Sequence, residues 1–499
     1  MKYITYQFIV FVAMLMFGCQ YEFPDNVNEQ SASGEADFTK MVAVGNSITA
    51  GYMDGALYDR GQQNAFTVIL AEQMKAAGGG DFNIPHINSE NGLYSLSPDG
   101  TPLGRLVLTT DPHTGTVGPA PIGPGELPSP FAGDKTALNN FGVPGVTMAT
   151  VLIPEIAIPN HLLFNPMYAR MASNPGTSTL IGDAAAALAD GGTFFSFWLG
   201  SNDVYGYALG GAANPSLLTS NENFQMQLNA AIGTMLNANA AAKGIIMNIP
   251  SIDLLPHFNL INPLAISLPE AIRPELGMGI AQLNMAISGW NTAVQANPQI
   301  PEPLKASLIR PLLSDDFDAY PLLILDPALS DAVVPLPRGE TFSIPKIRNI
   351  SQDDEIKLPL TAQVALAQGM GINPLSPLNE VQYDAFYLSK VEQEEIRTKI
   401  NTFNGYITAA AQAQPERLLL IDIDDFLTQV SQGTVSFGNV SLTASIIPPT
   451  GAFSVDGIHP NGRAHAFIAN FIIEKINEKW GATLPKTNPN AFPGNDLPR

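Results

Sequence analysis

A serine, a histidine and an aspartate in this sequence have the surroundings of a nucleophile, a base and an orienting acid. Ser47 lies in the turn Gly-Asn-Ser-Ile-Thr, directly after a buried apolar run. Asp456 precedes His459 by three residues, a spacing that can place both side chains on one side of a single turn. The carboxylate would fix the imidazole tautomer and leave the other ring nitrogen to take a proton from the serine. This pattern predicts nucleophilic attack on a carbonyl carbon.

Two further segments carry groups that could support such a reaction. Gly145 ends a Gly-Val-Pro-Gly turn, and Asn202 lies in Gly-Ser-Asn-Asp; each segment follows an apolar run of its own. The carboxyl ends of parallel strands emerge at one edge of a sheet, where open α/β folds bind their ligands. We therefore expect Gly145 and Asn202 to converge on Ser47.

The elements that would position these residues alternate between strands and helices. Apolar periodicity indicates helices from Ser220, after the capping box at Ser389, and near Ala464–Ile476. Such alternation predicts a three-layer α/β/α sandwich around a mainly parallel five-stranded sheet, with large insertions. The predicted strands are Met41–Val44, Leu138–Phe141, Thr193–Leu199, Gly244–Ile249 and Leu418–Ile423.

These blocks, read together, resemble the SGNH or GDSL hydrolase family. The family carries Ser, Gly, Asn and His in four ordered blocks, and this chain has GNSITAGY, NNFGVPGVT, GSND and DGIHPN. The resemblance spans about 41–480 and implies a flavodoxin-like sheet. It also implies an oxyanion hole made by the N–H groups of Ser47 and Gly145 and the Asn202 side chain. One departure is Asn46, where the family has Asp.

The resemblance implies a serine esterase that hydrolyses carboxylic esters through a triad of Ser47, His459 and Asp456 and an acyl-enzyme intermediate. Free imidazole titrates near pH 6.5, so activity is expected to fall in acid. Two alternatives remain open: an O-acyltransferase that uses the same residues, and a non-catalytic surface lipoprotein that binds glycan or lipid. The sequence lacks the GxGxxG, HExxH and CxxC motifs, and we expect no cofactor and no metal.

Charge narrows the class of partner. With 45 acidic and 24 Lys or Arg residues, the chain has a net charge of −21, which repels phosphate backbones and anionic bilayers. We expect a small-molecule, lipid or glycan ester as substrate, and no nucleic acid; the oligomeric state is left open. An acidic cluster at Asp422, Asp424 and Asp425 lacks the spacing of an EF-hand and is interpreted as a solvated strand end.

The N-terminus has the features of an export signal. Lys2 precedes an apolar run over Tyr3–Phe17, which at about 15 residues is shorter than the ~20 that a spanning helix needs. The following Gly18-Cys19 resembles a bacterial lipobox. It implies a signal peptide over 1–18, lipidation of Cys19 and a polar tether over 19–36. The expected location is the cell envelope of a bacterium, with the protein held to a membrane by its lipid.

The remaining chain is divided as follows. A hydrolase domain is expected over 37–481, with insertions at about 76–137 and 258–380 that roof the pocket and set specificity, and a tail over 482–499. His465 is interpreted as a packing or surface residue and Arg463 as a surface residue. No role is assigned to the other histidines, which are His86, His113, His161 and His257.

Overall fold

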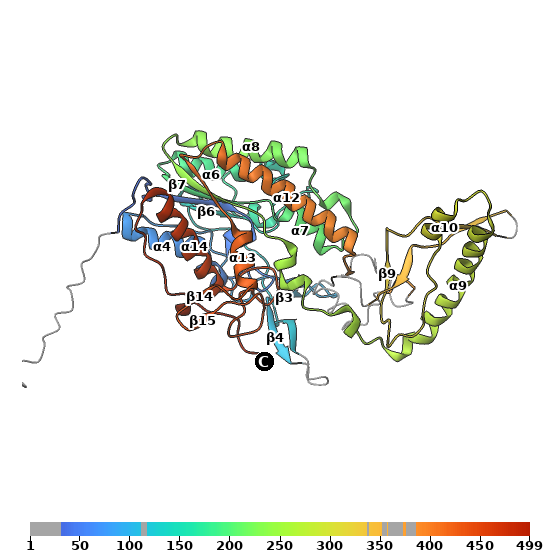
Figure 1. Ribbon diagram of the computed structural model, residues 1–499. Helices are drawn as coiled ribbons and strands as arrows, with labels where there is room; N and C mark the ends of the chain where they lie inside the picture. The colour runs from blue at the N-terminus through green and yellow to red at the C-terminus, as the bar shows by residue number, and fades with distance from the viewer. Residues whose placement is uncertain (1–30, 111–116, 337–338, 352–356, 358–372, 376–385) are drawn as a thin grey trace, which may run out of the picture.

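The computed structural model describes residues 31–110, 117–336, 339–351, 357, 373–375 and 386–499. At its centre lies a five-stranded sheet whose strands all run parallel (Figure 1). Each strand falls on one of the predicted apolar runs. In chain order they are β1 (Met41–Gly45), β6 (Asn140–Gly142), β7 (Phe194–Trp198), β8 (Lys243–Met247) and β13 (Leu418–Ile421).

The order of the strands shows where the chain reverses its winding direction across the sheet. They lie in the order β13-β8-β7-β1-β6, and Ala43 of β1 pairs with Ser196 of β7 and with Asn140 of β6. The chain passes from β1 to its neighbour β6 on one side. It then crosses back over β1 to β7 on the other side, so the winding direction reverses between β1 and β7. Open α/β sheets bind ligands outside the carboxyl ends of the strands at such a reversal.

Helices cover both faces of this sheet (Figure 1). One face carries α6 (Leu180–Ala189), α8 (Asn221–Ala238) and α12 (Lys390–Gln412), and the other carries α4 (Phe66–Met74) and α14 (Gly462–Trp480). All three predicted helices are therefore confirmed. Both hydrogen bonds of the capping box between Ser389 and Glu392 are present at the start of α12. The helix α14 ends at Gly481, which has the left-handed conformation.

Shorter elements complete the body of the molecule. The short helices are α2 (Ser47–Ala50), α3 (Asp59–Gln63), α5 (Pro166–Ala169), α7 (Asn202–Leu209) and α13 (Ile423–Ser431). Three hairpins are β2 (Ser95–Leu96) with β3 (Pro102–Leu103), β4 (Leu106–Thr110) with β5 (Val117–Pro121), and β14 (Ser436–Phe437) with β15 (Val440–Ser441). Turns of 3₁₀ helix occur at Lys75–Ala77, Lys135–Ala137, Pro154–Ala157, Pro215–Leu217, Ile252–Leu254, Pro256–Phe258, Pro263–Ala265, Glu270–Ile272 and Pro489–Ala491.

Within the second insertion, residues 262–336 and 339–350 form an arm that projects from the body (Figure 1). Its longest helix is α9 (Arg273–Ala296). The arm has a hydrophobic core of its own, which includes Leu276, Ile280 and Ile287 and is separate from the core around the sheet. The other elements of the arm are α10 (Glu302–Leu308), β9 (Leu323–Leu325) paired with β12 (Ile347–Asn349), and β10 (Val333–Pro335) paired with β11 (Thr341–Ser343).

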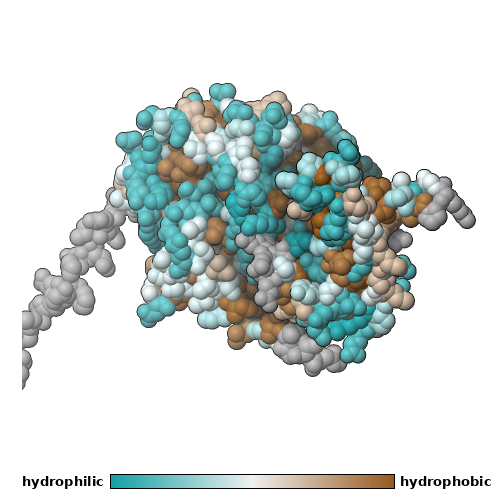
Figure 2. Space-filling model, turned by 45° about the vertical axis from the view of Figure 1, so that its right-hand side comes forward, coloured by the Kyte–Doolittle hydropathy of each residue, from teal (hydrophilic) through white to brown (hydrophobic). Residues whose placement is uncertain are grey.

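The C-terminal segment, predicted as an extended tail, packs along the body. Leu484 is buried, the Asn495 side chain donates to the carbonyls of Ile446 and Phe453, and Arg499 pairs with β4 through its backbone. The face shown in Figure 2 mixes hydrophilic and hydrophobic residues. Among the described residues, none of the helices has the length and hydropathy needed to cross a bilayer.

Candidate active site

Ser47 stands at the tip of β1, where the chain turns into the helix α2. The turn is made by Asn46, whose Oδ1 accepts a hydrogen bond from the Ile48 N–H at 3.0 Å and so caps the helix. Asn46 is buried, and its amide oxygen does the capping that an aspartate would do. Gly45 has no room for a side chain, because a Cβ there would lie 2.0 Å from Thr49 Oγ1. The departure at Asn46 thus leaves the support of the serine intact.

A continuous chain of hydrogen-bond distances joins Ser47, His459 and Asp456. Nε2 of His459 lies 2.8 Å from Ser47 Oγ, and Nδ1 of the same ring lies 2.8 Å from Asp456 Oδ2. The second oxygen of Asp456 accepts from the N–H groups of Ile458 and His459, both at 2.9 Å. The structure therefore brings together the three residues whose spacing predicted a nucleophile, a base and an orienting acid.

The carboxyl group of Asp456 is buried and tied to the turn that follows Ser47. Gly55 N–H donates to Asp456 Oδ2 at 2.9 Å. Burial alone would raise the pKa of Asp456, but the positive field of the His459 ring and the hydrogen bonds to the carboxylate outweigh it. The pKa of Asp456 therefore lies well below its ordinary value. An ionised carboxylate in this position would stabilise the His459 ring if that ring took up a proton.

Tyr52 forms one wall beside the histidine. Its ring centroid lies 4.8 Å from that of His459 at an interplanar angle of 52°, and its hydroxyl donates to the Gly55 carbonyl. Burial, and next the charge of Asp456, raise the pKa of Tyr52, so the phenol keeps its proton. The tyrosine restricts the rotation of the imidazole. It belongs to the block GNSITAGY, but nothing in the spacing indicated this contact.

His257, to which the sequence assigned no role, lies directly under the turn that carries Asp456 and His459. Its Nδ1 is 3.0 Å from the Asp456 carbonyl oxygen, and its backbone N–H donates to the Gly457 carbonyl at 2.9 Å. A carbonyl can only accept, so Nδ1 carries the proton. Burial lowers the pKa of His257, which keeps the ring neutral. Gly457 has a φ of +73°, and a Cβ there would lie 2.8 Å from the His257 nitrogen.

Three hydrogen-bond donors lie where an oxyanion could form. In the described part of the chain, the N–H groups of Ser47 and Gly145 donate no hydrogen bond to the protein. Asn202 begins α7 and donates from Nδ2 to the Val146 carbonyl at 2.8 Å, which leaves its second amide hydrogen available. The turn at Gly145 has a φ of +77°, a conformation that favours glycine.

Asp203 connects the segment that follows Gly145 to the segment that contains Asn202. Its carboxylate accepts from the N–H groups of Met148 and Ala149 and from the Thr219 hydroxyl. Burial raises the pKa of Asp203 to about 6, although these three donors act in the opposite direction. The turn that holds Gly145 is in this way clamped to the start of α7, next to Asn202.

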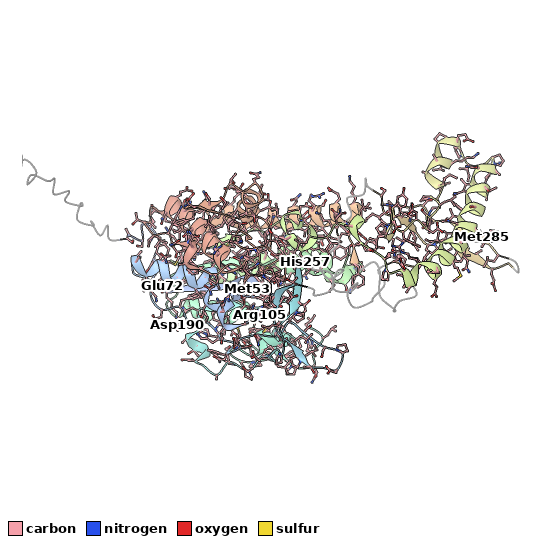
Figure 3. The ribbon with its side chains drawn as sticks, turned by 90° about the horizontal axis from the view of Figure 1, so that it is seen from below. Met53, Glu72, Arg105, Asp190, His257 and Met285 are labelled. Carbon is pink, nitrogen blue, oxygen red and sulfur yellow. The ribbon has the colours of Figure 1, made fainter. Side chains whose placement is uncertain are left out.

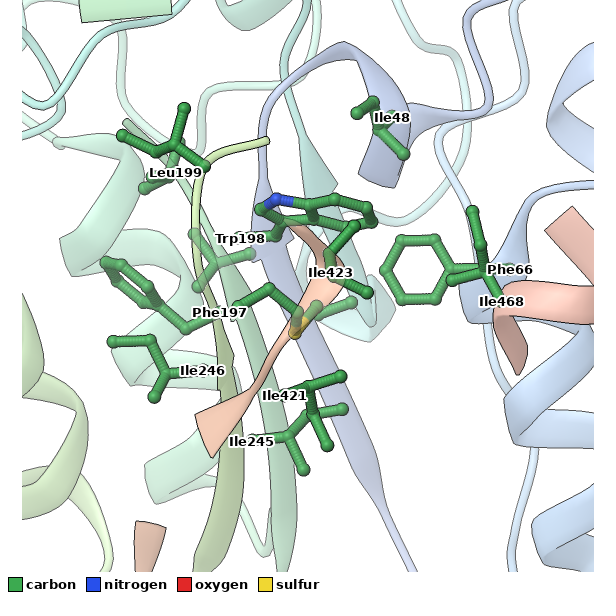
Figure 4. Close-up of a cluster of buried hydrophobic side chains, with 14 of the residues drawn as sticks. Ile48, Phe66, Phe197, Trp198, Leu199, Ile245, Ile246, Ile421, Ile423 and Ile468 are labelled. Carbon is green, nitrogen blue, oxygen red and sulfur yellow. The ribbon is translucent and has the colours of Figure 1, made fainter. Parts of the chain in front are cut away.

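A cavity of about 400 Å³ opens onto these groups, and Ser47, Gly145, Asn202 and His459 all line it. Figure 4 shows Ile48, Ile423 and the ring of Phe66 around Trp198. Trp198, Ile423 and Ile468 line the cavity. Further apolar lining comes from Tyr205, Leu255, Leu427, Phe453, Phe164 and Met167. The walls beyond the catalytic groups are thus largely aliphatic and aromatic.

The expected roof over this cavity is largely missing from the described residues. From the insertion at 76–137 only Leu93 lines the cavity, and no described residue of 258–380 does. The arm instead packs its apolar side chains against one another. Walls come from segments that follow the strands, such as 164–167 after β6.

The other residues weighed from the sequence lie outside the cavity. Asp422 and Asp425 are exposed directly after β13, as expected of a solvated strand end, and Asp422 also caps α13 through Oδ1, which accepts from the Asp425 N–H. His465 is buried and accepts from the Phe66 N–H, as expected of a packing residue. Arg463 donates to the Pro449 carbonyl. Within the described ranges no three His, Cys, Asp or Glu residues gather as a metal site, and Cys19 lies outside those ranges.

Comparisons with known proteins return no match, whether the chain is compared with protein-family models, with curated proteins or with solved structures. The geometry of the site therefore carries the functional inference.

Proposed function

We propose that this protein is a serine esterase of the SGNH type, which hydrolyses carboxylic esters through an acyl-enzyme intermediate. The observation that carries the proposal is the pair of 2.8 Å distances from Ser47 Oγ to His459 Nε2 and from His459 Nδ1 to Asp456 Oδ2. These groups come from opposite ends of the sequence. An unrelated packing role would not need a hydroxyl, an imidazole and a carboxylate in line beside a cavity.

The geometry suggests the following reaction. His459 takes the proton of Ser47 as the oxygen attacks the ester carbonyl, and the imidazolium is stabilised by the ionised Asp456. The negative oxygen of the tetrahedral intermediate is met by the N–H groups of Ser47 and Gly145 and by the Asn202 amide. The alcohol leaves with the proton from His459. Water, activated by the same histidine, then releases the acid from Ser47.

The lining of the cavity favours esters with an aliphatic acyl group. Trp198, Ile423 and Ile468 line the space beyond the serine together with Leu427, and no described Asp, Glu, Lys or Arg side chain lines the cavity. An acetyl group would leave most of this apolar surface in contact with water. A longer acyl chain would bury it, at about 25 cal/mol for each Å² removed from water.

Hydrolysis of p-nitrophenyl esters of increasing acyl length tests the proposal. Wild type should hydrolyse them, with kcat/KM rising from acetyl toward longer chains. Ser47→Ala should fold normally and lose the activity. A folded wild-type protein without activity at any chain length, or an active Ser47→Ala variant, would contradict the proposal.

We also propose that the protein is exported and anchored to a membrane by a lipid on Cys19, on the strength of the lipobox-like segment alone. Metabolic labelling with a fatty acid should mark the wild type and leave Cys19→Ser unmarked. Equal labelling of both proteins would contradict the anchor and would leave the proposed esterase untouched.

A further inference from the structure

A loop at the rim of the cavity exposes an unbroken run of apolar side chains. Every residue from Ile158 to Phe164 is exposed, and Leu162 reaches 95% exposure. Leu163 and Phe164 follow it directly. Single apolar residues on a surface are ordinary, but three consecutive ones in water carry a cost that a folded chain avoids unless they contact something.

The base of this rim loop, residues 156–165, is fixed to the oxyanion turn. Asn165 N–H donates to the Ile156 carbonyl at 2.7 Å and closes the loop. The Asn165 side chain donates from Nδ2 to the Pro144 carbonyl at 2.9 Å, while its Oδ1 caps α5 by accepting from the N–H groups of Met167 and Tyr168. The tip therefore stands out from a braced base.

The loop also forms part of the cavity wall. Phe164 and Asn165 line the same cavity as Ser47, and Pro144 adjoins Gly145. Phe164 is thus both exposed and part of the cavity, so the apolar surface continues from the tip into the space proposed for the acyl chain. A lipid could pass from an apolar phase to the serine without crossing a charged surface.

The charge of the loop and of the whole chain indicates which kind of lipid surface the loop could bind. Between Ile156 and Ala169 there is no Asp, Glu, Lys or Arg, in a chain whose net charge is −21. An anionic bilayer would repel the molecule as a whole and would find no Lys or Arg in the loop to offset this. A zwitterionic or neutral lipid surface carries no such penalty.

We propose that the tip of the rim loop, residues 158–164, inserts into a zwitterionic lipid surface and places the cavity mouth against it. The substrate class is then a lipid ester with an aliphatic acyl chain, taken from an aggregated phase. This inference rests on the proposed function for the identity of the reaction, but the insertion of the loop does not depend on it.

The first test compares one enzyme on two presentations of an ester. The full chain, wild type or with Leu162→Ser and Leu163→Ser together, acts on p-nitrophenyl butyrate in solution and on p-nitrophenyl palmitate carried in phosphatidylcholine vesicles. Neither leucine lines the cavity. The double variant should keep its rate on the dissolved ester within about twofold and lose roughly tenfold or more on the vesicle-borne ester. Equal rates for both proteins on the vesicles would overturn the inference.

A matched control is offered by the arm. Leu304 and Leu312 are exposed to 50% and 58%, and the variant with Leu304→Ser and Leu312→Ser removes the same number of exposed leucines. This control should hydrolyse the vesicle-borne ester like wild type. If it loses as much as the rim-loop variant, the lipid surface is met by the arm or by no particular site, and the inference fails.

Adsorption separates this inference from the proposed function. The Ser47→Ala protein, with and without the two rim-loop substitutions, is sedimented with phosphatidylcholine vesicles; any lipid on Cys19 is common to both. The rim-loop substitutions should lower the bound fraction, even if no ester is ever hydrolysed. An unchanged bound fraction would overturn the inference. Sedimentation velocity tests whether the rim loop instead holds two copies of the chain together. A dimer that the substitutions dissociate, with adsorption to vesicles unchanged, would also overturn the inference.

Discussion

At the residue scale, Asn202 has a role that mutation can isolate. One hydrogen of its amide is bound to the Val146 carbonyl, and the other is available at the cavity. Asn202→Ala should lower kcat about 10²- to 10³-fold with little change in KM, because the lost hydrogen bond strengthens only as charge develops on the oxygen. Steady-state kinetics and a melting curve of the variant check this. An unchanged kcat would remove Asn202 from the oxyanion hole.

His257 is a positioning residue, since it touches the catalytic turn and not the substrate. His257→Ala should lower kcat about 10- to 100-fold at a nearly constant KM, because the Asp456 carbonyl loses its donor and the turn shifts. His257→Asn can place an amide N–H near the position of Nδ1 and should recover most of the rate. If alanine and asparagine are equally impaired, the hydrogen bond is not what His257 contributes.

Residue types and spacing predicted that Ser47, His459 and Asp456 lie together, but they did not predict the residues that support these three. Asp456 and His459 are three residues apart, so local turn geometry was enough to place them together. His257 and Asp456 are 199 residues apart, and their contact exists only because the segment after β8 passes beneath the turn before α14. A lone histidine after a proline gives no signal of such a contact.

At the scale of elements, the packing of α14 on α4 depends on a buried histidine. Nδ1 of His465 accepts from the Phe66 N–H at the start of α4, and burial lowers the pKa of His465 to about 3. The unfolded chain takes up a proton near pH 6.5, so between these values the unfolded state binds more protons. The contribution of neutral His465 to the free energy of unfolding is therefore fully present above pH 6.5 and decreases as the pH falls below that value.

The variant His465→Asn tests this pH dependence, because its amide oxygen can accept the hydrogen bond from the Phe66 N–H but does not titrate. The difference in unfolding free energy between wild type and variant should fall by about 2 kcal/mol between pH 8 and pH 5. Urea unfolding at both pH values supplies the numbers. A difference that stays constant would show that His465 does not titrate between the two states.

The elements were predictable where one periodicity dominates. Strands of the sheet are buried on both faces and appear as unbroken apolar runs, while α8, α12 and α14 carry apolar residues at helical spacing. Asp422 and Asp425 are exposed directly after β13, as predicted, but their spacing did not indicate the helix α13 that begins there. In the fold Asp422 caps the helix, and Asp424 accepts from the Ser251 N–H.

At the scale of the whole molecule, the arm and the body have separate cores. Figure 3 shows Met285 on the arm, well apart from His257 in the body. Ile287→Ala should destabilise the arm by about 2–5 kcal/mol and leave ester hydrolysis unchanged. Ile245→Ala in β8 should cost a similar amount in the body and abolish activity at a lower temperature. Calorimetry measures the unfolding transitions of the two variants, and an assay after heating measures the activity that each retains. A single transition that both substitutions shift equally would contradict independent unfolding of the arm and the body.

The position of the insertions could not be predicted from their composition. Apolar pieces in 258–380 fit an acyl pocket as well as a core, and in the described part of the arm they form a core. Conversely, the rim loop follows β6 in sequence and gave no motif, yet it forms a wall of the cavity. Which surface an insertion covers depends on the path of the whole chain, which local spacing does not encode.

We propose that His459 and Asp456 activate Ser47. Labelling of the full chain with a fluorophosphonate, followed by mass spectrometry of its peptides, tests this most directly, because only an activated serine reacts. We expect modification of Ser47 alone, at a rate that is at least about 10³-fold lower in His459→Gln and also lower in Asp456→Asn. A folded wild-type protein that is not labelled at Ser47, or is labelled equally fast without His459, would contradict it.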